Sequence, residues 1–159
     1  MKIFFDAEFY ENGKVIELIS IGMVREDGES YYAETLNARN IADMTEWLRI
    51  NVQPHLIGKE KDKLKIKSEI INFVGETPEF WAYYADYDWV VLCQLFGTMM
   101  DLPGSWPMFC MDIKQLAVMK GDPELPRQIG AEHSALSDAI WNKQAWEFLN
   151  SLPTQKFKR

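Results

Sequence analysis

The sequence has little of what marks several common protein classes. Its two cysteines, Cys93 and Cys110, lack the C-x-x-C spacing of zinc and redox motifs, and we expect free thiols in a reducing compartment. No uninterrupted apolar run approaches membrane-spanning length, and no basic and apolar leader opens the chain. Repeats and low-complexity tracts are missing as well. These absences argue against zinc, membrane and repeat proteins, and we expect a cytoplasmic protein with no membrane partner.

Positive charge is also scarce, because 17 Lys and Arg stand against 24 Asp and Glu, for a net charge of -7. This balance argues against a protein that coats nucleic acid through broad phosphate contacts. It does not exclude an enzyme that grips one phosphate through metal ions, whose bound charge locally reverses the sign. Basic residues gather only in alternate positions from Lys59 to Lys67, which we expect on a solvated helix surface, and in the tail from Lys156 to Arg159.

Length and aromatic content narrow the class further. A chain of 159 residues fits one domain, residues 1–159, with a single substantial core. Aromatic residues make up 13% of the chain, more than such a core requires. The surplus leaves aromatic surface for stacking on flat ligands such as nucleobases.

The order of apolar patterns predicts an α/β fold. Three apolar runs separated by Asn12-Gly13 and Asp27-Gly28 predict an antiparallel meander with type I′ hairpin turns. Helical spacing, then alternating strands and helices, occupies the remainder and predicts a mixed five-stranded sheet with helices on both faces. The expected strands span residues 2–10, 15–24, 30–36, 80–84 and 108–110, and the expected helical regions span 37–75 (broken near 51–54), 86–96, 113–119 (capped by Asp112) and 134–149. Residues 120–130 are expected to form a mobile loop.

Two acids in the first strand require an explanation. Asp6 and Glu8 lie in the middle of an apolar, aromatic run and, two residues apart on a strand, point to the same side. Adjacent carboxylates in a partly apolar setting repel each other unless a cation lies between them. Hard oxygen ligands of this kind favour Mg²⁺ or Mn²⁺ over zinc. The alternative is an exposed strand end where both acids meet solvent.

Two further acidic motifs stand where a strand gives way to a helix. Asp86-Tyr87-Asp88 follows the strand at residues 80–84, and His133-Ser134-Ala135-Leu136-Ser137-Asp138 opens the last helix. Such loops and helix starts are where open α/β sheets bind ligands. Taken singly, each motif is also explained as a helix cap or a first-turn acid. Their order and number favour a shared site.

With these motifs the chain resembles the DEDDh class of 3′-5′ exonucleases, which includes ribonuclease T and oligoribonuclease. The motifs around Asp6, residues 17–22, Asp88 and His133 are similar to those of compact exoribonucleases of the polyadenylate-specific 3′-exoribonuclease AS type. The resemblance implies a ribonuclease H-like fold and release of nucleoside 5′-monophosphates from RNA 3′ ends, single-stranded or overhanging. It also implies a two-metal mechanism with Mg²⁺ or Mn²⁺.

The same resemblance implies a role for each site residue. Asp6, Glu8 and Asp138 would hold metal, Asp88 would hold the second ion and His133 would be the general base. The chain departs from the common pattern at Tyr84, where relatives often have Asn, and at Phe9, where many have Thr or Ser.

These departures leave several alternatives. Asp86 is a rival for the third acidic ligand, although Asp88 follows the aromatic residue as in the family. Ala7 and Phe9 are candidate substrate contacts, with Phe9 equally explained as core. The sequence also leaves open a DNA 3′-exonuclease of the same class, a ribonuclease H-type endonuclease, a non-catalytic nucleotide-binding module, and a homodimer.

Overall fold

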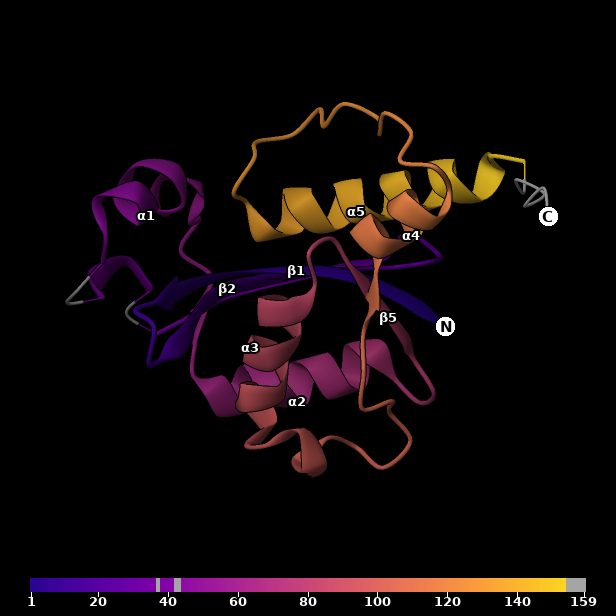
Figure 1. Cartoon of the computed structure of the whole chain (residues 1–159). Helices are drawn as coiled ribbons and strands as arrows, with labels where there is room; N and C mark the ends of the chain where they lie inside the picture. The colour runs from indigo at the N-terminus through magenta and orange to yellow at the C-terminus, as the bar shows by residue number, and fades with distance from the viewer. Residues whose placement is uncertain (37, 42–43, 154–159) are drawn as a thin grey trace.

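The computed structural model describes residues 1–36, 38–41 and 44–153, so the basic tail lies outside the described residues. Within them, one mixed sheet has the strand order β4-β3-β2-β1-β5-β6, with helices on both faces (Figure 1). The strands are β1 (Lys2–Glu11), β2 (Ile16–Arg25), β3 (Ser30–Thr35), β4 (Glu60–Lys61), β5 (Glu79–Ala82) and β6 (Met111–Asp112). The α-helices are α1 (Glu46–Asn51), α2 (Lys63–Val74), α3 (Asp86–Phe96), α4 (Ile113–Met119) and α5 (Ala135–Ser151).

The predicted antiparallel meander is confirmed. β1 pairs with β2 and β2 pairs with β3, both antiparallel, whereas β5 joins β1 and β6 joins β5 in parallel. The pairing of β1 with β5 covers only Lys2 to Phe4. Beyond Phe4, this edge of β1 is not paired with β5, which leaves its backbone groups open to side chains from α3.

The two hairpin connections are longer than the predicted type I′ turns. Residues 12–15 join β1 to β2, and within them Gly13 takes a φ of 80° while the Asn12 side chain accepts backbone hydrogen bonds. Gly28 takes a φ of 97° between β2 and β3. A single glycine in the left-handed region, helped by an Asx turn, suffices for these wider connections.

The sheet has a sixth strand where we predicted five, within residues 37–75 that we predicted as helical. This strand, β4, runs parallel to the end of β3. The buried carboxylate of Glu34 in β3 accepts hydrogen bonds from the backbone N–H groups of Ile57 (2.6 Å) and Gly58 (3.1 Å) and so ties the following segment to the edge of β3. The charged run Lys59–Lys61 has no apolar alternation from which a strand could be predicted.

The later elements agree more closely with the sequence. α3 and α4 have the predicted bounds, and Asp112 caps α4 by accepting a hydrogen bond from the Gln115 N–H at 2.7 Å. The short strand predicted at residues 108–110 was misplaced, because β6 comprises Met111–Asp112. Phe109 is 60% exposed and belongs to the loop before this strand.

The sheet is covered on both faces, as predicted. α4 and α5 lie on one face, and α2 and α3 lie on the other (Figure 1). Consecutive residues of β1 point to opposite faces, so Phe4 packs in the core beneath α4 and α5 while Phe5 packs in the core with α2 and α3. A third apolar cluster holds α1 against Ile19 of β2. Among the described residues, none forms a helix both long and apolar enough to cross a membrane.

Candidate active site

Three carboxylates meet between β1 and the start of α5. Asp6 and Glu8 lie two residues apart in β1, and Asp138 extends from the first turn of α5. One oxygen of each carboxylate lies within 4.8 Å of the others. The structure therefore brings together the first and last acidic motifs of the sequence.

Gly22 of β2 allows the start of α5, which carries Asp138, to approach the sheet closely. It pairs with Asp6 in the sheet and lies directly beneath the beginning of α5. A Cβ atom at Gly22 would come within 2.3 Å of the Ala135 carbonyl oxygen, far closer than two such atoms can approach. The buried Asn142 side chain adds a second fixed point, because its Nδ2 donates a hydrogen bond to the Phe5 carbonyl oxygen at 2.8 Å.

Asp88 joins the carboxylates from the opposite face of the sheet. It lies in the first turn of α3, is 6% exposed, and accepts a hydrogen bond from the Ala7 N–H at 2.9 Å. This N–H lies beyond the part of β1 that pairs with β5, so a side chain can reach it. The charge of Asp88 acts on both Asp6 and Glu8, which places it beside the group although not within its tightest cluster.

Asp86, the rival ligand, lies elsewhere. It is exposed and lines a different cavity, of about 400 Å³, together with Trp89 and Asp112. Two residues along a helix turn the side chain by about 200°. The geometry therefore favours Asp88 over Asp86 as the fourth carboxylate.

Burial raises the proton affinity of all four acids, and repulsion by neighbouring carboxylates raises it further for Asp6, Glu8 and Asp88. Burial, followed by the charges of Asp138 and Asp88, raises the pKa of Glu8 to about 8. Burial raises the pKa of Asp88 to about 7, and burial with the charges of Asp88, Glu8 and Asp138 raises the pKa of Asp6 well above its usual range. Burial also raises the pKa of Asp138, although hydrogen bonds from Gln128 and the Ser134 N–H act in the opposite direction.

These four residues fit a site for hard divalent cations. Within residues 1–36, 38–41 and 44–153, no lysine or arginine forms a salt bridge with any of them. Buried carboxylates without a cationic partner are costly, and an ion bound between them removes that cost. A set of oxygen ligands alone is the donor chemistry of Mg²⁺ and Mn²⁺.

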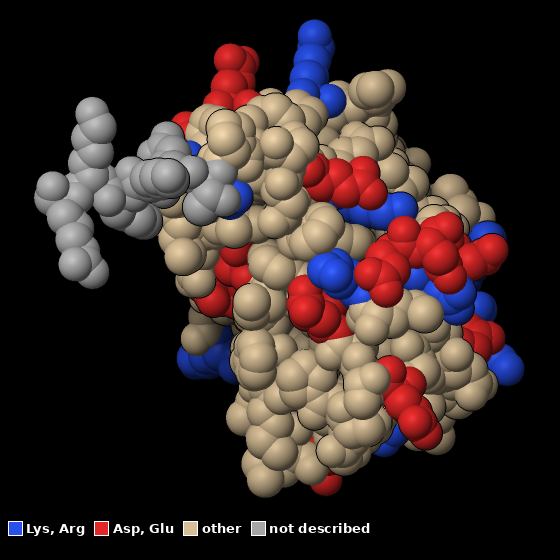
Figure 2. Space-filling model, turned by 90° about the vertical axis from the view of Figure 1, so that its right-hand side faces the viewer, with Lys and Arg blue, Asp and Glu red and all other residues tan. Residues whose placement is uncertain are grey.

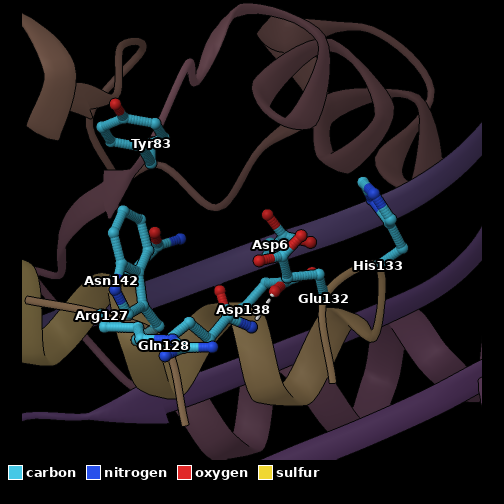
Figure 3. Close-up of a pocket in the computed structure, with 9 residues that line it drawn as sticks. Asp6, Tyr83, Arg127, Gln128, Glu132, His133, Asp138 and Asn142 are labelled. Carbon is cyan, nitrogen blue, oxygen red and sulfur yellow. Dashed lines mark hydrogen bonds between the residues drawn. The ribbon is translucent and has the colours of Figure 1, made fainter. Parts of the chain in front are cut away.

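His133 stands at the rim of the same site, apart from the carboxylates (Figure 3). It precedes the Ser134 N-cap of α5 and has a left-handed backbone with a φ of 61°. The Ser134 N–H donates to Asp138 Oδ2 at 3.1 Å, which ties the loop at His133 to the carboxylate group. The charge and the backbone of His133 both act on Asp138 and oppose the rise in its pKa, so the predicted base lies close to the acids with its side chain at the rim.

A cavity of about 410 Å³ opens beside the carboxylates, a volume in the usual range for small-ligand sites. Its lining comprises Asp6, Tyr83, Arg127, Gln128, Glu132, His133, Asp138, Trp141 and Asn142 (Figure 3).

Six of these lining residues were not predicted as site residues from the sequence. Asn142 lies one helical turn after Asp138, a spacing that could have indicated it. Gln128 donates a hydrogen bond to Asp138, and Trp141 Nε1 donates one to the Pro126 carbonyl at 2.8 Å. These bonds anchor the loop we had predicted to be mobile, and its irregular sequence carries no periodic signal for them.

Ala7 and Phe9, the candidate substrate contacts, do not line this cavity. Both belong to the core on the α2 and α3 face, where Phe9 packs on Tyr87 with ring centroids 5.7 Å apart. Strand alternation explains this for Ala7, because residue 7 points away from the side that presents residues 6 and 8. Phe9 follows an irregularity in the pairing of β1 between Glu8 and Phe9 and packs against the same core as Ala7. The core interpretation of Phe9 is the one that agrees with the structure.

The backbone at Tyr84 explains why relatives often have Asn at this position. Its backbone has a φ of 56°, in the left-handed region that Asn tolerates better than most residues. The turn here joins β5 to α3 and so positions Asp88. Tyr84 keeps this backbone shape while its ring packs edge-on against Tyr83, with centroids 4.6 Å apart.

Comparison with known proteins agrees with this site. Residues 1–150 match the model of the Rv2179c-like 3′-5′ exoribonuclease domain. The chain belongs to this family. It is 37% identical over 147 residues to the 3′-5′ exoribonuclease Rv2179c of Mycobacterium tuberculosis (strain H37Rv), covering 87% of each protein.

Solved structures with low sequence identity share the fold of this family member. The Mg²⁺ and Mn²⁺ bound form of S. pombe Pop2p has a TM-score of 0.67 at 14% identity, with 99% of this chain and 86% of that chain covered. Exonuclease I from Methylocaldum szegediense has a TM-score of 0.71 at 12% identity, over 97% of this chain and 41% of that chain. The predicted ribonuclease H-like α/β fold is thereby confirmed.

Proposed function

We propose that this family member is a metal-dependent 3′-5′ exoribonuclease that releases nucleoside 5′-monophosphates. The observation that carries the proposal is the set of carboxylate oxygens of Asp6, Glu8 and Asp138 within 4.8 Å of one another, none of them in a salt bridge with a lysine or arginine of the described part of the chain. The 37% identical mycobacterial relative is a 3′-5′ exoribonuclease, which supports the reaction and the direction.

Asp6, Glu8, Asp138 and Asp88 would hold two Mg²⁺ or Mn²⁺ ions. When bound, such ions supply activation of water and neutralisation of charge on the phosphate. The Mg²⁺ and Mn²⁺ bound form of Pop2p, which shares the fold, is consistent with this choice of metal. Gln128, Ser134 and Ala7 each direct an N–H group at one of these carboxylates and so fix the orientation of Asp138 and Asp88.

The cavity beside the carboxylates would receive the terminal nucleotide. Tyr83 and Trp141 provide aromatic surface in its wall, with ring centroids 5.0 Å apart. Arg127 provides a positive charge in the wall of the same cavity, suited to a phosphate of the substrate. A nucleotide can therefore be gripped by its base and its phosphate while the acidic side of the cavity faces the scissile bond.

His133 would act as the general base. An imidazole accepts a proton near neutral pH, and general base catalysis contributes about 10²–10⁴-fold in rate. The loop that carries His133 is tied to Asp138, so the base and the carboxylates are held in one unit.

RNA 3′ ends, single-stranded or overhanging, are the proposed partner, with DNA as the alternative substrate of the same chemistry. RNA is supported because the mycobacterial relative is an exoribonuclease. A structure of E. coli exonuclease I with single-stranded DNA, similar in fold at a TM-score of 0.66, illustrates the alternative. The free thiols of Cys93 and Cys110 support action in a reducing compartment, which we propose is the cytoplasm.

The test is digestion of 5′-labelled RNA with a 3′ overhang, and of the matched DNA, in Mg²⁺, Mn²⁺ or EDTA. We expect a ladder that shortens from the 3′ end of RNA with either metal and stops in EDTA. The Asp6→Asn variant should give no ladder. Internal cleavage products, or binding of nucleotide without any cleavage, would contradict the proposal.

A further inference from the structure

One contact at the rim of the site has no part in the function described above. The imidazole of His133 packs edge to face against the indole of Trp47, with ring centroids 4.7 Å apart and an interplanar angle of 73°. Trp47 belongs to α1, far from His133 in the sequence. The contact matters here because the proposed function makes His133 the base, and the inference rests on that assignment.

α1 presents Trp47 from a fixed position. The Thr45 side chain caps the helix by accepting a hydrogen bond from the Leu48 N–H, and Leu48 and Val52 are buried in the cluster around Ile19 of β2. Trp47, which directly precedes the buried Leu48, is 51% exposed. An exposed indole of this size on a firmly packed helix forms a rigid wall rather than a part of the core.

The backbone of His133 is held from the other side. The Ser134 N–H is bonded to Asp138 Oδ2, and the Gln128 Nε2 donates to the Ala131 carbonyl at 3.2 Å. With the backbone tied to the carboxylate group, the remaining freedom of His133 lies in its side-chain torsions. The indole of Trp47 restricts those torsions, and a restricted base loses less entropy when it reaches its productive geometry.

We infer that Trp47 is a positioning residue for His133 and that its indole holds the imidazole at the rim of the cavity beside the carboxylates. The alternative role for an exposed tryptophan here is a stacking surface for a nucleobase, which would act on substrate affinity. The two roles separate in kinetics, because a positioning residue affects kcat and a stacking surface affects KM.

The contact itself can be tested without activity. The chain has two histidines, His55 and His133, so its imidazole NMR signals are few enough to assign. Trp47→Leu should shift the His133 signals by removing the indole ring current and leave the His55 signals in place. Ile50→Ala, a matched change at a 64% exposed residue of the same helix, should move neither set. Unchanged His133 signals in Trp47→Leu would overturn the inference.

Kinetics on the RNA substrate supply the functional test. We expect Trp47→Ala to lower kcat by about tenfold with KM nearly constant, and Trp47→Phe, which keeps an aromatic ring, to restore most of the loss. In a His133→Ala background, Trp47→Ala should have little additional effect, because a positioning residue acts through the base. Ile50→Ala should retain normal kinetics.

Two kinetic results would contradict the inference. A rise in KM at constant kcat would make Trp47 a stacking surface, and full additivity with His133→Ala would make its role independent of the base. A wild-type protein that degrades neither RNA nor DNA would instead remove the proposed function, while the NMR contact between the two rings would still be observed.

Discussion

At the scale of single residues, the four site carboxylates are held in an environment that opposes their ionisation. The pKa of Glu8 is raised to about 8 and that of Asp88 to about 7, with burial as the largest cause in both. A structural role alone would be served better by neutral or apolar residues. The arrangement is explained by an ion that binds the charged forms.

The stability of the metal-free protein should therefore fall as pH rises. A carboxylate whose pKa is higher in the folded than in the unfolded state binds more protons when folded, so its ionisation destabilises the fold. For Glu8 this loss runs from its ordinary pKa of 4.5 to about 8. We expect the melting temperature in EDTA to decrease between pH 5 and pH 8, as followed by differential scanning fluorimetry.

Added Mg²⁺ or Mn²⁺ should reverse this trend. The ions bind the deprotonated carboxylates, so the gain in melting temperature should be larger at pH 8 than at pH 5. Asp6→Asn, which removes one charge from the cluster, should be more stable than the wild type in EDTA and gain less from metal. An equal metal-induced shift at both pH values would argue against a carboxylate site.

Substitution of Asp86 and of Asp88, the two acids in the first turn of α3, should have very different effects on kcat. Asp88→Asn removes a buried carboxylate beside Asp6 and Glu8, and we expect a loss of about 10³-fold in kcat, equivalent to ~4 kcal/mol of transition-state stabilisation. Asp86→Asn, at an exposed residue that lines a different cavity, should retain activity within about twofold. RNA digestion rates of the two variants decide between them, and the reverse order would make Asp86 the ligand.

Sequence alone could place some of these residues and not others. Asp6 and Glu8 were predicted because two acids in an apolar strand have few explanations. Choosing between Asp86 and Asp88 needed the orientation of α3, which depends on the Tyr84 turn and on the open N–H of Ala7. Gln128 and Arg127 lie in an irregular loop, where the sequence pattern does not determine which side chains face the cavity.

At the scale of elements, the close approach of α5 to β2 determines the position of Asp138. We expect Gly22→Ala to destabilise the protein by about 1–3 kcal/mol, because its Cβ would collide with backbone atoms of Ala135 and Leu136. The same displacement would move Asp138 and lower kcat. Thermal unfolding and RNA digestion measure the two effects.

Gly104→Ala is the control for this change. A Cβ at Gly104 meets no atom within 4 Å, so the variant should keep normal stability and activity. A Gly22→Ala protein with wild-type melting temperature and kcat would show that α5 can move without consequence for the site.

The elements that sequence predicted well are those with strong periodicity or clear caps. α3 and α4 have the predicted bounds, helped by Gly97 after α3 and Asp112 before α4. β4 was missed because its two charged residues pair with β3 only through long-range contacts that the buried Glu34 organises. Strands that form through long-range contacts of this kind have no local sequence pattern from which they could be predicted.

At the scale of the whole molecule, the charge distribution predicts how the enzyme holds RNA. The net charge is -7, and on the face shown in Figure 2 the basic side chains of the described residues are interspersed with acidic ones. Few phosphates can then be neutralised by lysine or arginine. The apparent affinity for RNA should fall by only about tenfold between 50 and 200 mM salt, a shallow dependence for a nucleic-acid enzyme.

The salt dependence can be measured from KM for a short RNA. Arg127→Ala should raise KM and reduce the salt slope by about one contact, since Arg127 is the cation in the cavity wall. A loss of affinity of about 10³-fold over the same salt range would instead indicate a broad basic surface and contradict the account of a site that grips only the RNA end.

The measurement that tests the central claim most directly is Mn²⁺ binding by isothermal titration calorimetry in the presence of a nucleoside 5′-monophosphate. The account predicts about two ions per chain for the wild type and for Asp86→Asn, and fewer for Asp88→Asn and Asp6→Asn. Absence of Mn²⁺ binding to the wild type, or equal stoichiometry in Asp88→Asn and the wild type, would contradict a metal centre built from these four carboxylates.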